Sequence, residues 1–268
     1  MALLPIHKYF VFNGEIKSIE EFIPSENEGG IYEVLRVVNG VPLFLEDHLK
    51  RFWVSAKIAE KEIRFSENEI EHFLKKLIKK NKIRFGNILI SCKTNLKIFY
   101  ILHNYPLQEW YSNGVVCGTM HAERNNPNAK VFQTPVRQKA NEMIAQKGFY
   151  EVMLIDHFGR ITEGSRSNVF FVKGNQIVTP EGNRVLLGIT RQKTILLAKK
   201  LGFNLYEKEV SISNLQTFEA AFITGTSPKI LPIKQIDGIL FNPQNEILQA
   251  LIKNFDELIA GYINKFSG

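Results

Sequence analysis

The stretch ITEGSRSNVFFVKGNQIVTP, residues 161–180, places one acid, Glu163, ahead of a run of small polar residues. The apolar run NVFFV that follows has the β-branched and aromatic content of a strand. The glycine in KGN marks a turn before the second apolar run, QIV. The stretch therefore predicts a β-hairpin with a single carboxylate at its mouth.

The sequence around this hairpin predicts further strands and helices. A helix that opens at Pro135 and closes at Gly148 follows the usual placement of proline and glycine at helix ends. The predicted elements of this half are helices over 134–148, 188–202 and 242–263 and strands within 150–164, 167–180 and 219–226.

The first 120 residues predict a smaller α+β unit. Asn39-Gly40 lies between two apolar runs and is a strong signal for a two-residue hairpin turn. Ser66 with Glu69 three residues later forms a capping box at the start of a helix. The predicted elements are strands within 8–16, 31–45, 86–93, 96–105 and 114–120 and helices over 46–59 and 66–80.

The segment HAERNNPNAK, residues 121–130, interrupts these patterns with three asparagines and a proline. Such a composition is typical of a linker between domains. We therefore expect a smaller N-terminal α+β domain over 1–120, a linker over 121–130 and a larger C-terminal domain over 131–268.

The composition narrows the functional classes. The chain has 268 residues, 44% of them hydrophobic, enough for one large domain or two smaller ones with apolar cores. The net charge of +7 could suggest nucleic acid, but the densest basic run, KKLIKKNK at 75–82, is better explained as a solvated helix face. No apolar run approaches the roughly 18 residues of a membrane span, and the N-terminus lacks a signal-peptide core. We expect a soluble protein that binds neither nucleic acid nor membrane.

The cysteines and histidines show no metal or disulfide pattern. Cys92 and Cys117 lack CxxC spacing, and the six histidines form no HExxH motif. We therefore expect no metal site and a location in the reducing cytoplasm.

Two segments have the features of an anion-binding site. In LLGIT, residues 186–190, the helix predicted from Ile189 would point unbonded backbone N–H groups outward, with the Thr190 hydroxyl beside them. In TGTS, residues 224–227, a glycine and three hydroxyls follow an apolar strand. Either segment alone is also explained by an ordinary helix cap or turn.

Taken in order, these motifs resemble the class IV aminotransferases, the pyridoxal-phosphate (PLP) enzymes of fold type IV. The most specific match is EGSRSNVF at 163–170, followed by Thr179 and LGITR at 187–191. Supporting matches are IYEV at 31–34, HLKRFWVSA at 48–56 and GTSPKILPI at 225–233. The resemblance covers nearly the whole chain and implies a two-domain α+β (α/β) fold like that of D-amino acid aminotransferase, in a homodimer.

The resemblance also implies a reactive lysine. In family members it lies eighteen residues before the glycine that precedes the next strand, and counting back from Gly148 gives Lys130. Lys130 would hold PLP as a Schiff base and then move the substrate proton as a free amine. A loop position at the end of the linker would let it reach a cleft between domains.

Further cofactor contacts are implied by the same resemblance. Glu163 would lie against the pyridine nitrogen and keep it protonated. Leu186 would pack on the ring. The implied phosphate contacts are Arg51, Ile189, Thr190 and Thr226. The alternative for Arg51 is a surface ion pair with Glu46 or Asp47.

Substrate recognition is less determined by the sequence. Strand alternation puts Tyr32 and Arg36 on one face, where the resemblance implies substrate contacts, as it does for Ser227. Arg36 is either a carboxylate ligand or one half of a strand-edge salt bridge. Arg166, where relatives usually carry a small residue, is either a surface residue or part of a carboxylate clamp.

The resemblance leaves the reaction partly open. The Arg-x-His carboxylate trap of D-amino acid aminotransferases is absent from residues 86–103, which disfavours a D-alanine type. We expect amino-group transfer between an amino acid and a 2-oxo acid. The alternatives are an aminodeoxychorismate lyase, whose length the chain approaches, and a non-catalytic or nucleic-acid-binding protein on the same fold.

Overall fold

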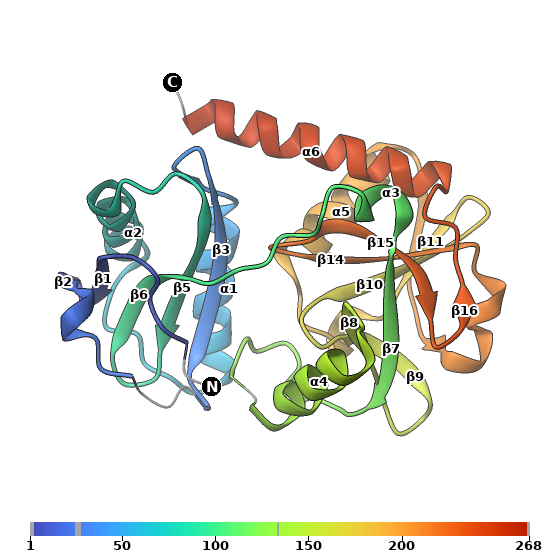
Figure 1. The fold of residues 1–268 in the computed structure, drawn as a ribbon, viewed down its shortest axis with the longest axis horizontal. Helices are drawn as coiled ribbons and strands as arrows, with labels where there is room; N and C mark the ends of the chain where they lie inside the picture. Colours follow the sequence, from blue (N-terminus) through green and yellow to red (C-terminus); the bar gives the residue numbers. More distant parts are fainter. Residues whose placement is uncertain (1–2, 25–27, 133, 267–268) are drawn as a thin grey trace. The chain divides into compact units, whose positions relative to one another are not determined.

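The computed structural model describes residues 3–24, 28–132 and 134–266 and divides the chain into two compact units. The first unit comprises Met1–Asn104, Ala129–Gln133 and Ile259–Gly268, and the second comprises Tyr105–Asn128 and Thr134–Leu258. Figure 1 colours the chain from blue at the N-terminus to red at the C-terminus.

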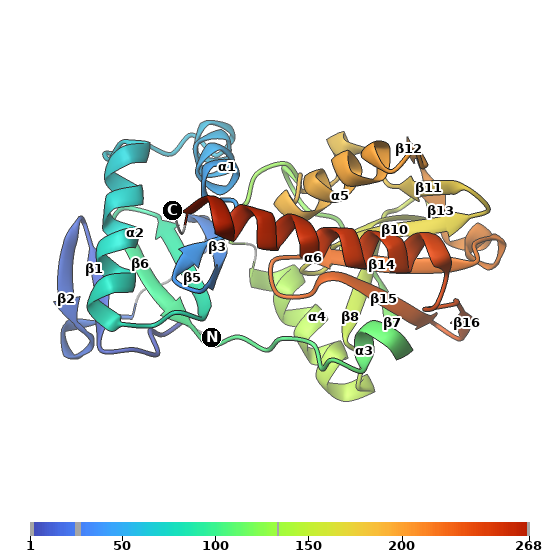
Figure 2. The same cartoon turned by 90° about the horizontal axis from the view of Figure 1, so that it is seen from above.

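The first unit is an antiparallel sheet with two helices on one face (Figures 1 and 2). Within the described residues the strand order is β2-β1-β6-β5-β3-β4. The strands are β1 (Tyr9–Phe12), β2 (Glu15–Ser18), β3 (Ile31–Val38), β4 (Val41–Pro42), β5 (Gly86–Cys92) and β6 (Leu96–Ile101). The helices are α1 (Leu45–Ile58), α2 (Glu67–Asn81) and the 3-10 helix η1 (Ile19–Glu21).

Local sequence signals determine several features of this unit. Asn39 and Gly40 have φ values of 53° and 83°, and the turn they form joins β3 to β4, as predicted. The Ser66 side chain accepts a hydrogen bond from the Glu69 N–H, and the Glu69 carboxylate accepts one from the Ser66 N–H, which confirms the capping box of α2. The buried side of the sheet packs on α1 and α2 through residues such as Leu35 and Phe52.

The second unit is built on a larger mixed sheet. Within the described residues the order is β12-β11-β10-β14-β15-β7-β8-β9-β13, and β16 pairs with β15. The strands are β7 (Val115–His121), β8 (Glu151–Ile155), β9 (Arg160–Gly164), β10 (Asn168–Lys173), β11 (Gln176–Thr179), β12 (Asn204–Glu207), β13 (Val210–Ser211), β14 (Ala220–Gly225), β15 (Lys229–Ile236) and β16 (Ile239–Leu240). The helices are α3 (Trp110–Asn113), α4 (Thr134–Lys147), α5 (Ile189–Lys200) and the 3-10 helices η2 (Gly182–Arg184) and η3 (Ile212–Thr217). The last helix, α6 (Glu246–Phe266), has residues in both units.

The structure differs from the sequence expectations in how its sheets are assembled. Strand β7, expected in a domain of residues 1–120, pairs in parallel with β8 and β15 of the second unit. The chain therefore passes from the first unit to the second near residue 105. Strand pairing determines this boundary, and the polar composition of residues 121–130 does not. Glu163 lies in strand β9, which pairs with β8 inside the predicted strand region 150–164, and the predicted hairpin of β10 and β11 follows it.

Strand β15, which was not among the predicted strands, holds a proline near its centre. Pro232 pairs with Phe222 of β14, whereas pairing with β7 on the other side begins at Ile233. Proline has no N–H to donate to a neighbouring strand. Pro232 is tolerated because the pairing of β15 with β7 begins only after it.

Candidate functional site

A buried group of three charged or titratable side chains lies in the first unit. Glu33 of β3 is fully buried on the face that packs against α1. Arg51 Nε donates to Glu33 Oε1 and Arg51 Nη2 to Oε2, each at 2.7 Å. His48 Nδ1 lies 2.7 Å from Glu33 Oε2. Arg51 is therefore a buried side chain that pairs with Glu33.

The charges of this group are set by its surroundings. Burial by itself would raise the pKa of Glu33, but the Arg51 charge and the hydrogen bonds from Arg51 and His48 outweigh it and lower that pKa to about 2. Burial lowers the pKa of His48, against the opposing effect of Glu33. At neutral pH an ionised Glu33 thus accepts hydrogen bonds from cationic Arg51 and from the Nδ1–H of neutral His48.

Lys130 is held against the same unit by its backbone. The Lys130 N–H donates to Ser55 Oγ of α1 at 3.0 Å, and the Lys130 carbonyl accepts from the Tyr32 N–H at 3.0 Å. The Lys130 Nζ lies 4.6 Å from the centroid of the Tyr32 ring, which in turn stacks on Phe132 at 4.0 Å. Lys130 therefore belongs to a segment fixed on β3 and α1, with its amine over an aromatic face.

Tyr32 and Arg36 lie on the sheet face opposite the helices, as the alternation of β3 predicted. A cavity of about 530 Å³ lies in this unit beside Phe132, with Phe10, Ser91 and Lys97 also in its wall. Burial lowers the pKa of Lys97, whose Nζ donates to the Ile23 carbonyl.

Glu163 is buried in the second unit and is held at both carboxylate oxygens. Arg124 Nε lies 3.2 Å from Glu163 Oε1, and the Leu186 N–H donates to Oε2 at 3.2 Å. Arg124 also donates from Nη2 to the Ser165 carbonyl, at 2.5 Å. The carboxylate is thus fixed by a guanidinium on one side and by the backbone of Leu186 on the other.

The segment before α5 is clamped by asparagine side chains. Asn168 Nδ2 donates to the Leu186 carbonyl at 2.8 Å, and Asn128 Nδ2 donates to the carbonyls of Gly182 and Val185. A Cβ at Gly188 would lie 2.1 Å from Asn168 Oδ1, so only glycine fits at this N-cap of α5. No side-chain hydrogen bond caps this helix in the described residues, so the N–H groups of its first turn can bind an anion.

Thr226 and Ser227 lie in the turn between β14 and β15. The chain approaches itself closely here, because a Cβ at Gly225 would lie 3.1 Å from Pro228. The buried Thr224 Oγ1 has no hydrogen-bond partner among the described residues. The turn thus offers hydroxyl groups, and the β14 strand that leads into it pairs Thr224 with Asn168 of β10.

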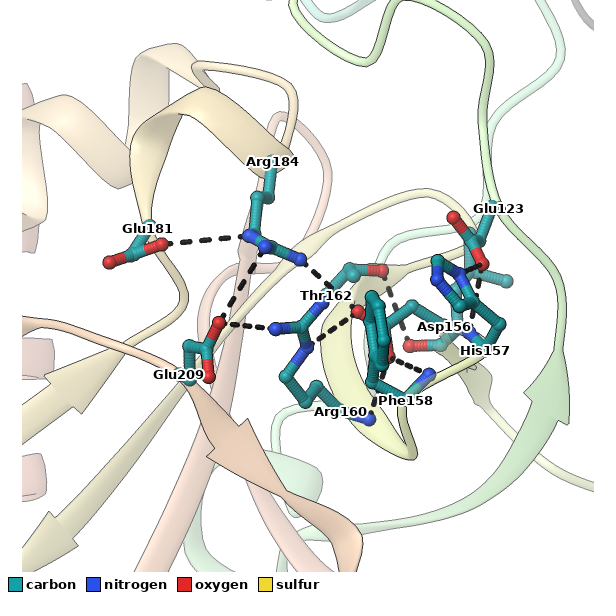
Figure 3. Close-up of polar contacts among 10 residues, drawn as sticks. Glu123, Asp156, His157, Phe158, Arg160, Thr162, Glu181, Arg184 and Glu209 are labelled. Carbon is teal, nitrogen blue, oxygen red and sulfur yellow. Dashed lines mark hydrogen bonds and ion pairs between the residues drawn. The ribbon is translucent and has the colours of Figure 1, made fainter.

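A charged cluster includes Arg184 of η2, in the segment before α5 (Figure 3). Asp156 Oδ2 accepts from Arg160 Nε at 2.8 Å and from Arg184 Nη1 at 3.3 Å. Arg184 also pairs with Glu181 and Glu209, each at 3.6 Å. Desolvation of Asp156 raises its pKa, but hydrogen bonds from the Arg160 and Phe158 N–H groups and the Arg160 side chain outweigh this and lower it. The cluster joins the β8–β9 turn to η2.

The predicted site residues divide into two sets, one in each unit. The first unit holds Lys130, Arg51, Tyr32 and Arg36, and the second holds Glu163, Leu186, Ile189, Thr190, Thr226 and Ser227. Arg166 is exposed, and its Nη2 donates to the Tyr150 carbonyl at 3.0 Å.

Several residues in these sets were missed by sequence reasoning. Glu33 could have been found, because it occupies the apolar register of IYEVLRVV, where a carboxylate needs a buried partner. Arg124 and Asn128 lie in the segment interpreted as a linker, and only the folded structure shows what they bind.

Two further findings concern metals and membranes. Among the described residues, no three or more His, Cys, Asp or Glu side chains are grouped so that they could hold a metal ion. In residues 3–24, 28–132 and 134–266, no helix combines the length and apolar character needed to cross a membrane.

Comparison with known proteins identifies the family. The model of the amino-transferase class IV family matches residues 30–236, and the chain belongs to this family. A D-alanine aminotransferase of Bacillus licheniformis is 31% identical over 85% of this chain and 88% of its own length. A branched-chain-amino-acid aminotransferase of Pseudomonas aeruginosa is 27% identical over 87% of this chain and 84% of its own.

Solved structures share the fold. A branched-chain amino acid aminotransferase of T.th., solved with pyridoxamine 5′-phosphate, has a TM-score of 0.86 at 24% identity, covering 96% of this chain and 95% of that one. The branched-chain aminotransferase of Escherichia coli has a TM-score of 0.83 at 23% identity, with coverage of 96% and 95%. The fold is therefore that of class IV aminotransferases, as the sequence signature implied.

Proposed function

We propose that this chain is a PLP-dependent aminotransferase that moves an amino group between an amino acid and a 2-oxo acid. The observation that carries the proposal is the fixed carboxylate of Glu163, paired with Arg124 and bonded to the Leu186 N–H. An anion held in this way can keep a pyridine nitrogen protonated. When bound, PLP supplies an aldehyde that condenses with an amine and a ring that withdraws electrons.

Each set of residues offers groups that suit this cofactor. In our proposal the phosphate is bound by Arg51, by the N–H groups and hydroxyl at Ile189 and Thr190, and by Thr226. Glu33 keeps Arg51 in one orientation through two hydrogen bonds, and Leu186 packs on the ring. The proposed phosphate ligands are thus a cation and several N–H and O–H donors. The proposed partner of the ring nitrogen is an anion.

Lys130 has the catalytic role in this proposal. Its amine would hold the cofactor as the Schiff-base lysine and, as a free amine, would accept and return the proton of the substrate Cα. The bonds that tie the Lys130 backbone to Ser55 and Tyr32 leave only its side chain to move.

The test is to locate the covalent attachment. Wild-type protein with PLP should show a visible band that borohydride removes, with mass spectrometry placing the reduced adduct on Lys130. Lys130→Ala should lose the adduct and reduce turnover by more than about 1,000-fold, whereas Lys139→Ala, an exposed residue of α4, should keep both. An adduct on another lysine in wild type would overturn the assignment.

The proposed substrates are an amino acid and a 2-oxo acid, and the particular amino acid is to be found by assay. D-Alanine and L-leucine, each with a 2-oxo acid acceptor, should be tested because they represent the activities named for these relatives. L-Glutamate should be tested because a related structure holds it as an adduct with the cofactor. The cavity beside Phe132 is our candidate for the substrate side chain, with Tyr32, Arg36 and Ser227 as further contacts. Release of pyruvate and 4-aminobenzoate from aminodeoxychorismate, without half-transamination of any amino acid, would instead establish the lyase.

The assembly and location are part of the same proposal. We infer a homodimer in the cytoplasm, with the two buried cysteines, Cys92 and Cys117, free as a reducing compartment requires. Light scattering should give twice the chain mass. Strong, salt-dependent binding of DNA or RNA by a protein that takes up no cofactor would favour the non-catalytic alternative.

A further inference from the structure

Glu151, at the start of β8, is a buried acid that the proposed chemistry does not use. Its carboxylate accepts four hydrogen bonds. The donors to Oε1 are the Val152 N–H at 2.9 Å and Ser165 Oγ at 2.6 Å. The donors to Oε2 are the Arg166 N–H at 3.1 Å and Ser167 Oγ at 2.9 Å. Three of the four belong to the turn that follows Glu163.

The geometry requires a carboxylate at this position. A hydroxyl group can reverse its hydrogen bond, but a backbone N–H can only donate. Each oxygen of Glu151 receives one backbone N–H, from Val152 or from Arg166. An amide in its place would direct its NH₂ group at one of these N–H groups in either orientation, leaving a buried donor unsatisfied.

The turn that Glu151 holds leads back to Glu163. Arg124 Nη2 and Arg137 Nη1 both donate to the Ser165 carbonyl, at 2.5 and 2.8 Å. Arg124 then reaches Glu163 through its Nε. The position of the Ser165 peptide therefore decides where the guanidinium of Arg124 meets the carboxylate of Glu163.

We propose that Glu151 is a positioning residue for Glu163, acting through the Ser165 peptide and Arg124. The inference rests on the proposed role of Glu163 at the ring nitrogen. The hydrogen bonds of Glu151 go to Val152 and to the turn of residues 165–167, so in this proposal its effect on the cofactor passes through that turn and Glu163. Its replacement should change the protonation of the bound cofactor and the turnover number while leaving KM nearly unchanged.

The test is a double-mutant cycle in which the pH titration of the visible absorption band of the bound cofactor is measured. Loss of the Glu163 anion should raise the pH midpoint at which the visible band titrates, because an unprotonated ring withdraws fewer electrons from the linkage to lysine. We expect Glu151→Gln to shift this midpoint in the same direction as Glu163→Gln, by about 0.5 pH unit. In the double variant the midpoint should equal that of Glu163→Gln alone, because positioning matters only when the carboxylate is present.

Controls separate this role from a general loss of stability. Glu219→Gln is the matched control, since Glu219 also accepts a backbone N–H, from Gly174, but in an exposed turn away from Glu163. It should leave the midpoint and turnover unchanged. If Glu151→Gln does not fold, Ser165→Ala and Arg124→Gln test the same series of contacts. Each should shift the midpoint in the protein that keeps Glu163, and neither should shift it further in the Glu163→Gln variant.

Two outcomes would overturn the inference. Equal shifts from Glu151→Gln with and without Glu163 would mean that Glu151 does not act through that carboxylate. A lowered melting temperature with an unmoved midpoint would leave it a purely structural residue. Absence of any cofactor band in the wild-type protein would instead refute the proposed function, on which this inference rests.

Discussion

Glu33 illustrates how one residue couples the core of the first unit to its candidate phosphate ligand. It lies between Ile31 and Leu35 in the apolar register of β3, and its two oxygens accept bonds from Arg51 and His48. A buried ion pair is costly to assemble but more costly to break, because removal of one partner leaves a buried charge. Glu33 therefore stabilises the fold mainly by neutralising Arg51.

Replacement of Glu33 should be strongly destabilising. For Glu33→Gln we expect a loss of about 3–5 kcal/mol in the free energy of unfolding, measured by urea denaturation at pH 7. Glu62→Gln, in an exposed loop, should change that free energy by less than about 0.5 kcal/mol. A similar loss in both variants would contradict the special role of Glu33.

The pH dependence provides a second check on the same residue. The pKa of Glu33 in the folded chain, about 2, lies below its ordinary value of 4.5. The stabilisation is therefore complete above about pH 4.5 and is lost as the pH falls toward 2, since the unfolded chain binds the proton first. The unfolding free energy of wild type should fall more steeply over this window than that of Glu33→Gln.

At the scale of elements, the start of α5 is defined by contacts from three other segments. Asn168 of β10 holds the Leu186 carbonyl, Asn128 holds η2, and the Asp156 cluster of Figure 3 holds Arg184. Exposed ion pairs contribute little by themselves, but Asp156 is buried and accepts several hydrogen bonds. The proposed phosphate site is therefore preorganised by side chains that do not themselves belong to it.

Gly188 offers a direct test of this packing. Gly188→Ala would place a methyl group 2.1 Å from Asn168 Oδ1, so we expect the affinity for PLP to fall by at least about tenfold, measured by fluorescence titration. In an Asn168→Ala background the same substitution should cost much less, because the clashing atom is gone. Equal costs in both backgrounds would show that the clash with Asn168 is not the cause.

At the scale of the whole molecule, the cofactor should stabilise the fold by mass action. PLP at 100 times its dissociation constant should contribute about 2.7 kcal/mol, if it binds only the folded chain. We expect the melting temperature to fall by about 5–10 °C when the cofactor is removed, measured by calorimetry. Pyridoxal, which lacks the phosphate, should restore less of the difference, and full restoration by pyridoxal would argue against the proposed phosphate contacts.

Much of the fold could be predicted because its signals are local. The Asn39-Gly40 turn, the Ser66 capping box and the glycine after α4 each depend on the dihedral preferences or side-chain bonds of neighbouring residues. The candidate site was predictable to the extent that the order of its motifs matches the family signature. Glu163, Arg51 and Lys130 were named from that order.

The sequence by itself therefore determined the family, most of the strands and helices, and the residues proposed to hold the cofactor. Only the tertiary structure decided that β7 belongs to the second sheet and that Glu33 is the partner of Arg51. It also decided that Arg124 meets Glu163 and that Glu151 holds the turn beside it. The physical reason is that these pairings join segments far apart in the chain, and no local pattern specifies which buried donor will meet which buried carboxylate.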